Sequence, residues 1–294
     1  MRAALALSGE EATADLLCDF DHVGLVRSEY LFRQDELYPT PTSAQPVLHD
    51  YLSATCAAAR GAPVWFRTLD VTTREANTLA GVEYRNFDEP FPLMGLRGIR
   101  RSMAYPESLE AELGVLADVY REQSTLGVVA PFVSEVDEFI WFRTRVERSV
   151  GSGSRVAVMV ETPAAVFELE KLVQAGASHV IVGTNDLSSL VSARVRVVGR
   201  STQTSPALER ALAQVRDVTA RHGATMTIAG YITTGLLASA EAIGADFVAV
   251  HYCDLPSLFG DRYANLPELG HVAAIKARTR RAIAALGRPA DGNI

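Results

Sequence analysis

A repeated alternation of short apolar runs with helix-like or loop segments is the feature that most constrains the fold of this chain. Eight β-like runs lie at residues 22–27, 63–70, 93–99, 127–133, 155–161, 179–186, 224–230 and 247–252. Amphipathic stretches lie between several of them, at residues 164–175, 205–222 and 235–243. This alternation predicts parallel strands with crossover helices. Eight such units within 294 residues favour one α/β domain, a (β/α)₈ TIM barrel over residues 1–294.

An open, doubly wound sheet is the alternative to a closed barrel. It is not favoured, because no Gly-x-Gly-x-x-Gly turn follows the first predicted strand. A long polar segment at residues 71–92 follows the second strand and is a candidate lid that would shape substrate choice. Residues 266–286 predict one amphipathic basic helix, and residues 287–294 a loose tail.

The charge and cysteine content exclude several classes of protein. The formal net charge is −7 and no Lys/Arg-rich run is present, which argues against a nucleic-acid partner. Three cysteines without metal-site or disulfide spacing fit a reducing cytoplasm. The apolar start of the chain is too short for a signal peptide, and no stretch approaches the length of a membrane span. We therefore expect a cytoplasmic protein.

Two acidic residues follow consecutive predicted strands. Glu161 ends the run at 155–161, and Asp186 ends the next run after Gly183-Thr184-Asn185. Neighbouring parallel strands bring both carboxylates to the same end of the sheet, where two hard oxygen ligands suit Mg²⁺. The alternative is that Glu161 caps a helix beginning near Pro163 and Asp186 closes a turn.

Arginines recur at the ends of the other predicted strands. Arg27 ends the first run, Arg67 lies near the end of the second, and Arg97 or Arg100 ends the third. Guanidinium groups bind carboxylate and phosphate through paired, charge-assisted hydrogen bonds. Arginines around two acids therefore predict a pocket for a small anion that carries both groups. Taken singly, each arginine is more typical of a surface or salt-bridge residue, whereas several at successive strand ends favour the pocket.

Six segments, taken in order, resemble the C-terminal phosphoenolpyruvate-binding barrel of phosphotransferase-system enzyme I, pyruvate phosphate dikinase and phosphoenolpyruvate synthase. They are residues 24–32 (GLVRSEYLF), 66–70 (FRTLD), 95–100 (GLRGIR), 130–133 (APFV), 159–165 (MVETPAA) and 183–187 (GTNDL). The resemblance covers nearly the whole chain. It implies a Mg²⁺-dependent barrel that dimerises.

The resemblance also implies roles for individual residues. Glu161 and Asp186 would bind Mg²⁺, and Asn185 would reach a phosphate oxygen. The phosphate and enolate of the substrate would be held by the strand-end arginines Arg27, Arg67 and Arg97. The family places a further arginine ten residues beyond the metal-binding Asp. Arg196 occupies that position, but Val195 precedes it instead of the expected Asp, so Arg194 is a rival.

The chain departs from the family where the proton donor is expected. Ala229-Gly230-Tyr231 stands where relatives carry Cys-Gly-Glu or Cys-Gly-Gln, whose cysteine protonates the enolate carbon of pyruvate. The glycine pair and lysine after the second-strand motif become Thr72, Thr73 and Glu75. No histidine lies in a recognisable swivelling-domain motif, so we expect no phosphorylatable histidine domain in this chain.

Three functions fit these departures. The first is an enzyme that stabilises the enolate of phosphoenolpyruvate or a pyruvate-derived α-keto acid for carbon–carbon bond formation or cleavage. The second is phosphotransfer with a separate phospho-histidine carrier protein, in which Tyr231, His251 or Cys253 replaces the missing acid. The third is a non-catalytic protein that binds phosphoenolpyruvate or stabilises a partner. His251 is also typical of a hydrogen-bonded residue at the barrel rim, and Tyr231 of a packed loop aromatic, neither with a part in catalysis.

Overall fold

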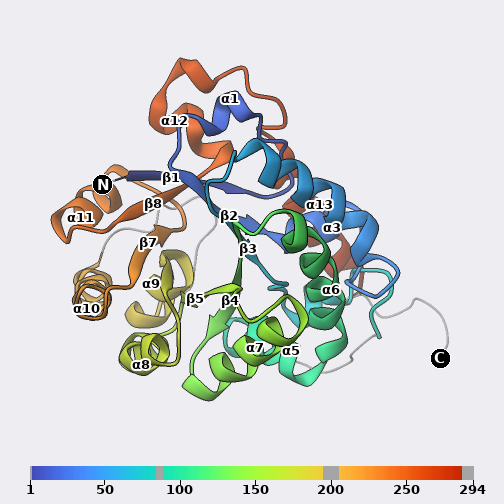
Figure 1. Ribbon diagram of the computed structural model, residues 1–294, viewed down its shortest axis with the longest axis horizontal. Coiled ribbons are helices and arrows are strands. Elements are labelled where there is room, and N and C mark those ends of the chain that lie inside the picture. The colour runs from blue at the N-terminus through green and yellow to red at the C-terminus, as the bar shows by residue number, and fades with distance from the viewer. Residues whose placement is uncertain (1, 84–88, 195–204, 287–294) are drawn as a thin grey trace.

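Eight parallel strands close into a barrel in chain order (Figure 1). The computed structural model describes residues 2–83, 89–194 and 205–286. The strands are β1 (Arg2–Leu7), β2 (His22–Arg27), β3 (Val64–Arg67), β4 (Leu126–Val133), β5 (Arg155–Val160), β6 (His179–Gly183), β7 (Thr225–Ala229) and β8 (Phe247–His251). Parallel pairing of β1 with β8, from Arg2 with Phe247 to Ala6 with His251, closes the ring. The predicted single TIM barrel is confirmed.

Helices surround the barrel. The α-helices are α1 (Ala14–Leu17), α2 (Ser28–Gln34), α3 (Ala44–Ala58), α4 (Thr73–Ala76), α5 (Gly98–Ala104), α6 (Pro106–Glu122), α7 (Val136–Ser149), α8 (Pro163–Gln174), α9 (Thr184–Ser192), α10 (Pro206–His222), α11 (Thr234–Ala242), α12 (Leu255–Phe259) and α13 (His271–Leu286). Short 3₁₀ turns are η1 (Pro92–Met94), η2 (Tyr252–Asp254) and η3 (Asp261–Tyr263). The helices predicted at 164–175, 205–222 and 235–243 are α8, α10 and α11.

Side-chain caps explain where these helices begin. Thr162, with Pro163 at the first helical position, accepts a hydrogen bond from the Ala165 N–H at the start of α8. Thr72 and Glu75 form a capping box that begins α4, inside the segment predicted as one long loop. Residues 84–88 of that segment lie outside the described part of the chain.

The predicted strand at 93–99 is wrong, and a strand at residues 2–7 was missed. The predicted number of strands is nevertheless eight, because one strand was added and one was missed. Residues 93–99 instead form η1 and the start of α5, because Pro92 opens a 3₁₀ turn and Gly98 adopts a φ of +51°. β1 is rich in alanine and leucine, which carry little β propensity. It becomes a strand because barrel closure gives it hydrogen-bonded neighbours on both sides.

The C-terminal helix is shorter than predicted. It begins at His271 instead of residue 266, after Gly270 and after Glu268, whose φ is +58°. Val272 and Ile275 of α13 pack against Tyr30 of α2. Residues 287–294, predicted as a tail, lie outside the described residues. Across the described ranges, every helix is too short or too polar to cross a bilayer.

Apolar side chains line the barrel interior, and aromatic rings gather at the end where the strands begin. Its apolar lining includes Ala4, Ala6, Ala157, Ala229 and Ala249, and its largest member is Trp65. His179 stacks on the Trp65 ring with centroids 4.5 Å apart. His22 meets the Phe247 ring edge-on, also at 4.5 Å. Both histidines stand at the first residue of their strands, so they lie at the end of the barrel opposite the strand carboxyl ends.

These buried histidines should make stability fall in mild acid. Burial lowers the pKa of His22 to about 4 and that of His179 to about 3, from an ordinary value of 6.5. As pH falls below 6.5 the unfolded chain therefore binds protons that the folded chain does not, and the free energy of unfolding decreases. Between pH 7.5 and 4.5 His22 alone should account for a loss of about 2.5 kcal/mol.

Urea unfolding of the His22→Leu variant at several pH values checks this. The wild-type-minus-variant difference in free energy should shrink by that amount between pH 7.5 and 4.5. The matched control is His222→Gln, which removes a histidine that pairs with Glu170 at the surface. Parallel pH profiles for wild type and His22→Leu would contradict the assignment.

Candidate active site

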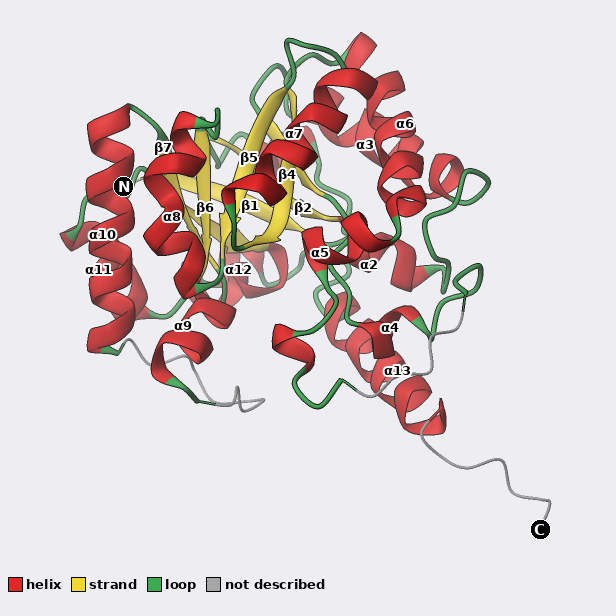
Figure 2. Cartoon of the chain, turned by 90° about the horizontal axis from the view of Figure 1, so that it is seen from below, coloured by secondary structure: helices red, strands yellow, loops and turns green. Residues whose placement is uncertain are grey.

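The carboxyl ends of the strands carry a cluster of buried ions. Figure 2 shows α4 and α9, which follow β3 and β6, at this same end of the barrel. At its centre Arg67, the last residue of β3, donates to Glu29 Oε1. Its Nη1 lies 3.6 Å from Asp70 Oδ2 and 3.8 Å from Glu161 Oε1. A buried guanidinium with three carboxylates around it is fixed in place, and its pKa is raised chiefly by the charge of Glu29 against the effect of burial.

Arg97 connects the two halves of this cluster. It immediately precedes α5, and it forms a two-pronged pair with Asp70 through Nε at 3.0 Å and Nη2 at 2.7 Å. The same Nη2 lies 3.3 Å from Asp186 Oδ2. Its guanidinium stands 4.3 Å from the centre of the Phe132 ring. Arg97, Asp70 and Asp186 therefore form one continuous ionic chain across the barrel mouth.

Phe132 has a backbone conformation that is unusual for a bulky residue. Its φ is +54°, in the left-handed region that bulky residues avoid. The pairing of β4 with β5 is also irregular between Ala130 and Val133. The resulting bulge turns the Phe132 N–H toward Glu161 Oε2, to which it donates at 3.1 Å. The local strain thus positions a carboxylate of the site.

Glu161 fits its position only because glycine stands beside it. A Cβ on Gly183 would lie 2.5 Å from Glu161 Oε1, closer than real atoms approach. Burial raises the pKa of Glu161 to about 8, against the opposing charge of Arg67 and with the help of Asp70 and Asp186. Negative charge at this carboxylate is therefore poorly compensated by the protein alone.

The charge count of the site points the same way. Four carboxylates, from Glu29, Asp70, Glu161 and Asp186, face the guanidinium groups of Arg67 and Arg97. Among the described residues, carboxyl groups outnumber guanidinium groups in this cluster, an arrangement that a divalent cation would stabilise. The oxygens of Glu161 and Asp186 are hard carboxylate donors, the type that Mg²⁺ prefers. The residues present therefore fit the predicted ion, with Glu161 and Asp186 as its candidate ligands.

Arg27 belongs to a second, adjacent cluster at the ends of β1, β2 and β8. Its Nε donates to Ser8 Oγ at 2.8 Å, and Nη2 lies against His251 Nε2. The guanidinium also stands 4.4 Å from the centre of the Tyr30 ring. Burial and then the positive charges of Arg27 and Lys276 hold the pKa of His251 well below its usual range. His251 is thus neutral, a state better suited to orienting Arg27 than to donating a proton.

The end of β7 carries no acid side chain at the predicted place. Ala229 is buried in the barrel lining, and its carbonyl accepts a hydrogen bond from Thr184 Oγ1 at 2.9 Å. The Tyr231 N–H donates to Asn185 Oδ1 at 3.1 Å, while its side chain is 48% exposed. Arg194 is exposed after α9, and Arg196 lies outside the described residues.

Four site residues were missed by sequence reasoning. Asp70, Glu29 and Phe132 all lie inside recognised motifs but were given no role. Ser8 followed the strand that was not predicted. The usable signal for Glu29 was an acid two residues beyond a strand-end arginine. The contacts of Phe132 depend on a β-bulge that cannot be recognised in the sequence.

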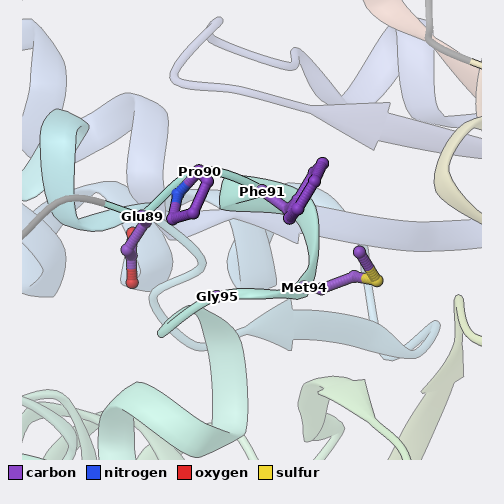
Figure 3. A pocket seen from close by; sticks show the side chains of 5 residues that line it. All are labelled: Glu89, Pro90, Phe91, Met94 and Gly95. Atoms are coloured by element: carbon purple, nitrogen blue, oxygen red, sulfur yellow. The ribbon is translucent and has the colours of Figure 1, made fainter.

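The segment that leads into Arg97 exposes apolar side chains. Glu89, Pro90, Phe91, Met94 and Gly95 line an open pocket of about 270 Å³ (Figure 3). Phe91 is 67% exposed and Met94 58%. Glu89 is buried and accepts a hydrogen bond from the Leu96 N–H at 2.7 Å, which fixes the turn before Arg97. The position fits the predicted lid, whose closure stays a prediction.

Most of this chain is similar in sequence to known proteins. The family described as "PEP-utilising enzyme, PEP-binding domain" matches residues 5–254. Phosphoenolpyruvate synthase of Pyrococcus furiosus is 32% identical over 229 residues, which is 71% of this chain and 27% of that protein. A protein of Salmonella typhimurium named "Phosphoenolpyruvate-dependent phosphotransferase system" is 26% identical over 241 residues, 77% of this chain and 31% of that one. The chain thus spans about three tenths of the length of these relatives.

Solved structures share the fold at low sequence identity. An HpcH/HpaI aldolase/citrate lyase family protein from Burkholderia cenocepacia gives a TM-score of 0.53 at 14% identity, over 98% of this chain and 95% of that one. Macrophomate synthase gives 0.50 at 14% identity, over 95% and 84%. These likenesses concern the barrel architecture alone.

Proposed function

The chain belongs to the PEP-utilising enzyme family through its PEP-binding domain, and we propose that it is a Mg²⁺-dependent enzyme acting on phosphoenolpyruvate or a pyruvate-derived α-keto acid. Its task would be to stabilise the enolate of that substrate. The observation that supports the proposal is that the two strand-end acids Glu161 and Asp186 lie in one buried ionic cluster with Arg67 and Arg97.

Each group of the site has a part in this chemistry. Glu161 and Asp186 would hold Mg²⁺, which supplies a Lewis acid for the carboxylate and enolate oxygens of the substrate. Arg97 is already oriented by Asp70 and the Phe132 ring, so its guanidinium would bind substrate oxygens with little reorganisation. Arg27, held by Ser8 and His251, would bind the anion from the adjacent cluster.

The apolar end of β7 favours a fate other than protonation for the enolate. Ala229 cannot deliver a proton to C3, so the nucleophilic carbon persists long enough to attack a carbonyl carbon. In that step C3 of the α-keto acid first loses a proton to solvent, the C2–C3 π electrons of the resulting enolate form the new carbon–carbon bond, the enolate oxygen becomes a carbonyl again, and the accepting carbonyl oxygen takes a proton from water. The reverse reaction cleaves the bond and returns its electrons to the enolate. We propose this lyase or aldol-type chemistry as the reaction class.

Phosphotransfer with a separate phospho-histidine carrier is the second candidate. It is favoured by the similarity to the phosphotransferase-system protein of Salmonella typhimurium. The backbone of Tyr231 is tied to Asn185 and its side chain is half exposed, so its hydroxyl is the available acid next to Ala229. Label transfer from a phosphorylated carrier protein would distinguish this reaction from carbon–carbon chemistry.

Hydrogen–deuterium exchange at the methyl group of pyruvate tests the proposal. In D₂O with Mg²⁺, wild-type protein should bind pyruvate, seen as a raised melting temperature, yet exchange its methyl protons slowly. Ala229→Cys should accelerate exchange by about 100-fold or more, the usual gain from a positioned acid–base group. Ala229→Ser is the matched control, since a hydroxyl of similar size is a much weaker acid. Absence of pyruvate and phosphoenolpyruvate binding by wild type would reject the proposed function.

A further inference from the structure

We propose that Glu10, His251 and Cys253 form a second metal site that takes Zn²⁺ or another thiolate-binding divalent cation. Glu10 follows β1, His251 ends β8 and Cys253 lies in η2. One ligand atom of each residue lies within 4.8 Å of the other two. The pairing of Ala6 with His251 brings the two strand ends together, although the residues are more than 240 positions apart.

The spacing is close to that of a tetrahedral site. Cys253 Sγ lies 3.3 Å from Glu10 Oε1. Zn–S and Zn–O bonds of about 2.3 and 2.1 Å at a tetrahedral angle place sulfur and oxygen about 3.6 Å apart. His251 Nδ1 accepts a hydrogen bond from the Cys253 N–H at 3.2 Å, so it faces the same residue, and a bound ion would replace this hydrogen bond. Shifts of side-chain torsions, without movement of the strands, would bring the three ligands onto one ion.

The donor set selects a metal different from that of the neighbouring acids. Thiolate and imidazole are borderline to soft ligands that suit Zn²⁺, whereas Mg²⁺ prefers oxygen ligands alone. Three protein ligands leave the fourth tetrahedral position for water or a substrate atom. The Glu10 site and the Glu161–Asp186 site would therefore hold different ions in the same barrel mouth.

The burial of Glu10 supplies an independent reason for a cation. Its side chain is 0% exposed, and no Lys or Arg of the described ranges forms an ion pair with it. Its partners are neutral: the Ser8 N–H donates to Oε2 and the Cys253 thiol donates to Oε1. A buried carboxylate served only by neutral donors lacks the charge partner that such groups usually have. A divalent ion bound with the Cys253 thiolate would supply it.

The site would also act on Arg27. A metal on His251 Nδ1 would put the ring proton on Nε2, so Arg27 Nη2 could no longer donate to Nε2, which would instead donate to Ser8 Oγ, 2.9 Å away. Ser8 Oγ is also the acceptor for Arg27 Nε. Occupancy would thus fix one tautomer and one arrangement of the Ser8–Arg27 pair. This positioning role rests on the proposed substrate contact of Arg27, whereas metal binding itself does not.

Co²⁺ titration of the purified full chain tests the site directly. Wild type should bind one Co²⁺ with a thiolate-to-metal charge-transfer absorption, and Zn²⁺ should displace it. Cys253→Ser should abolish the charge-transfer band, and Glu10→Gln should weaken binding at least about tenfold. Far-ultraviolet circular dichroism of both variants verifies that they fold.

Two control variants distinguish this site from other possible metal-binding side chains of the chain. Cys18→Ser removes an exposed cysteine and should leave the Co²⁺ band unchanged. Glu161→Gln alters the proposed Mg²⁺ site and should also retain the band, so failure of either proposal is visible without the other. A wild type with no charge-transfer band, or a band that survives Cys253→Ser, would overturn the second metal site.

Discussion

Glu161→Gln is expected to eliminate Mg²⁺-dependent ligand binding while raising the melting temperature of the metal-free protein. The buried carboxylate is under-compensated without a cation, as its pKa of about 8 indicates. A neutral isostere removes that cost and keeps the Phe132 N–H contact through its amide oxygen. The same change removes a metal ligand, which should cost more than the roughly 10–100-fold typical of outer-shell partners.

Calorimetric titration of oxalate, a planar dianion shaped like the pyruvate enolate, measures the loss with and without Mg²⁺. Differential scanning calorimetry measures the gain in stability. Gly183→Ala offers a second way to disturb the same carboxylate, because its Cβ would lie 2.5 Å from Glu161 Oε1. Gly114→Ala is the matched control, since its Cβ meets nothing within 4 Å. Unchanged Mg²⁺-dependent affinity in both site variants would show that Glu161 is not a ligand.

Arg67→Met is expected to destabilise the fold by about 3–5 kcal/mol, the usual cost of removing one partner from a buried ion network. The substitution keeps most of the apolar stem but leaves Glu29, Asp70 and Glu161 without their shared cation. Urea unfolding at pH 7.5 measures the difference. Arg121→Met is the control, because its pair with Asp118 is exposed and should contribute at most about 0.5 kcal/mol.

Partial rescue would identify the cause of this loss. Adding Glu29→Gln to Arg67→Met removes one uncompensated charge and should recover part of the lost stability. A double variant as unstable as the sum of the two single variants would mean that Arg67 acts mainly through packing. Arg67→Met and the double variant should both lose affinity for oxalate, because Arg67 also orders the carboxylate of Glu161.

Much of the site was predictable because it follows strand ends. Arg27 and Arg67 end β2 and β3, Glu161 follows β5, and Asp186 lies within the first turn of α9. Once parallel strands are recognised, these residues must meet at one rim of the barrel. Arg97 was placed at the correct rim from an incorrect strand, because the segment around it is a turn leading into α5.

The remainder depended on contacts between distant parts of the chain. Which carboxylates surround Arg67 was not predictable from spacing, since Glu29 comes from a helix and Asp70 from a loop. The three cysteines lack metal-site spacing in the sequence, yet Cys253 meets Glu10 when β8 closes onto β1. Closure also makes a strand of residues 2–7, whose composition favours none.

The sequence by itself determined the barrel class, seven of its eight strands and the rim at which the acids and arginines gather. These properties follow from local periodicity and chain direction, which each segment carries independently of the others. Only the tertiary structure decided the ion partners, the bulge at Phe132 and the Glu10–His251–Cys253 cluster. Such contacts arise from the packing of all eight units at once, so their free energies belong to no single segment.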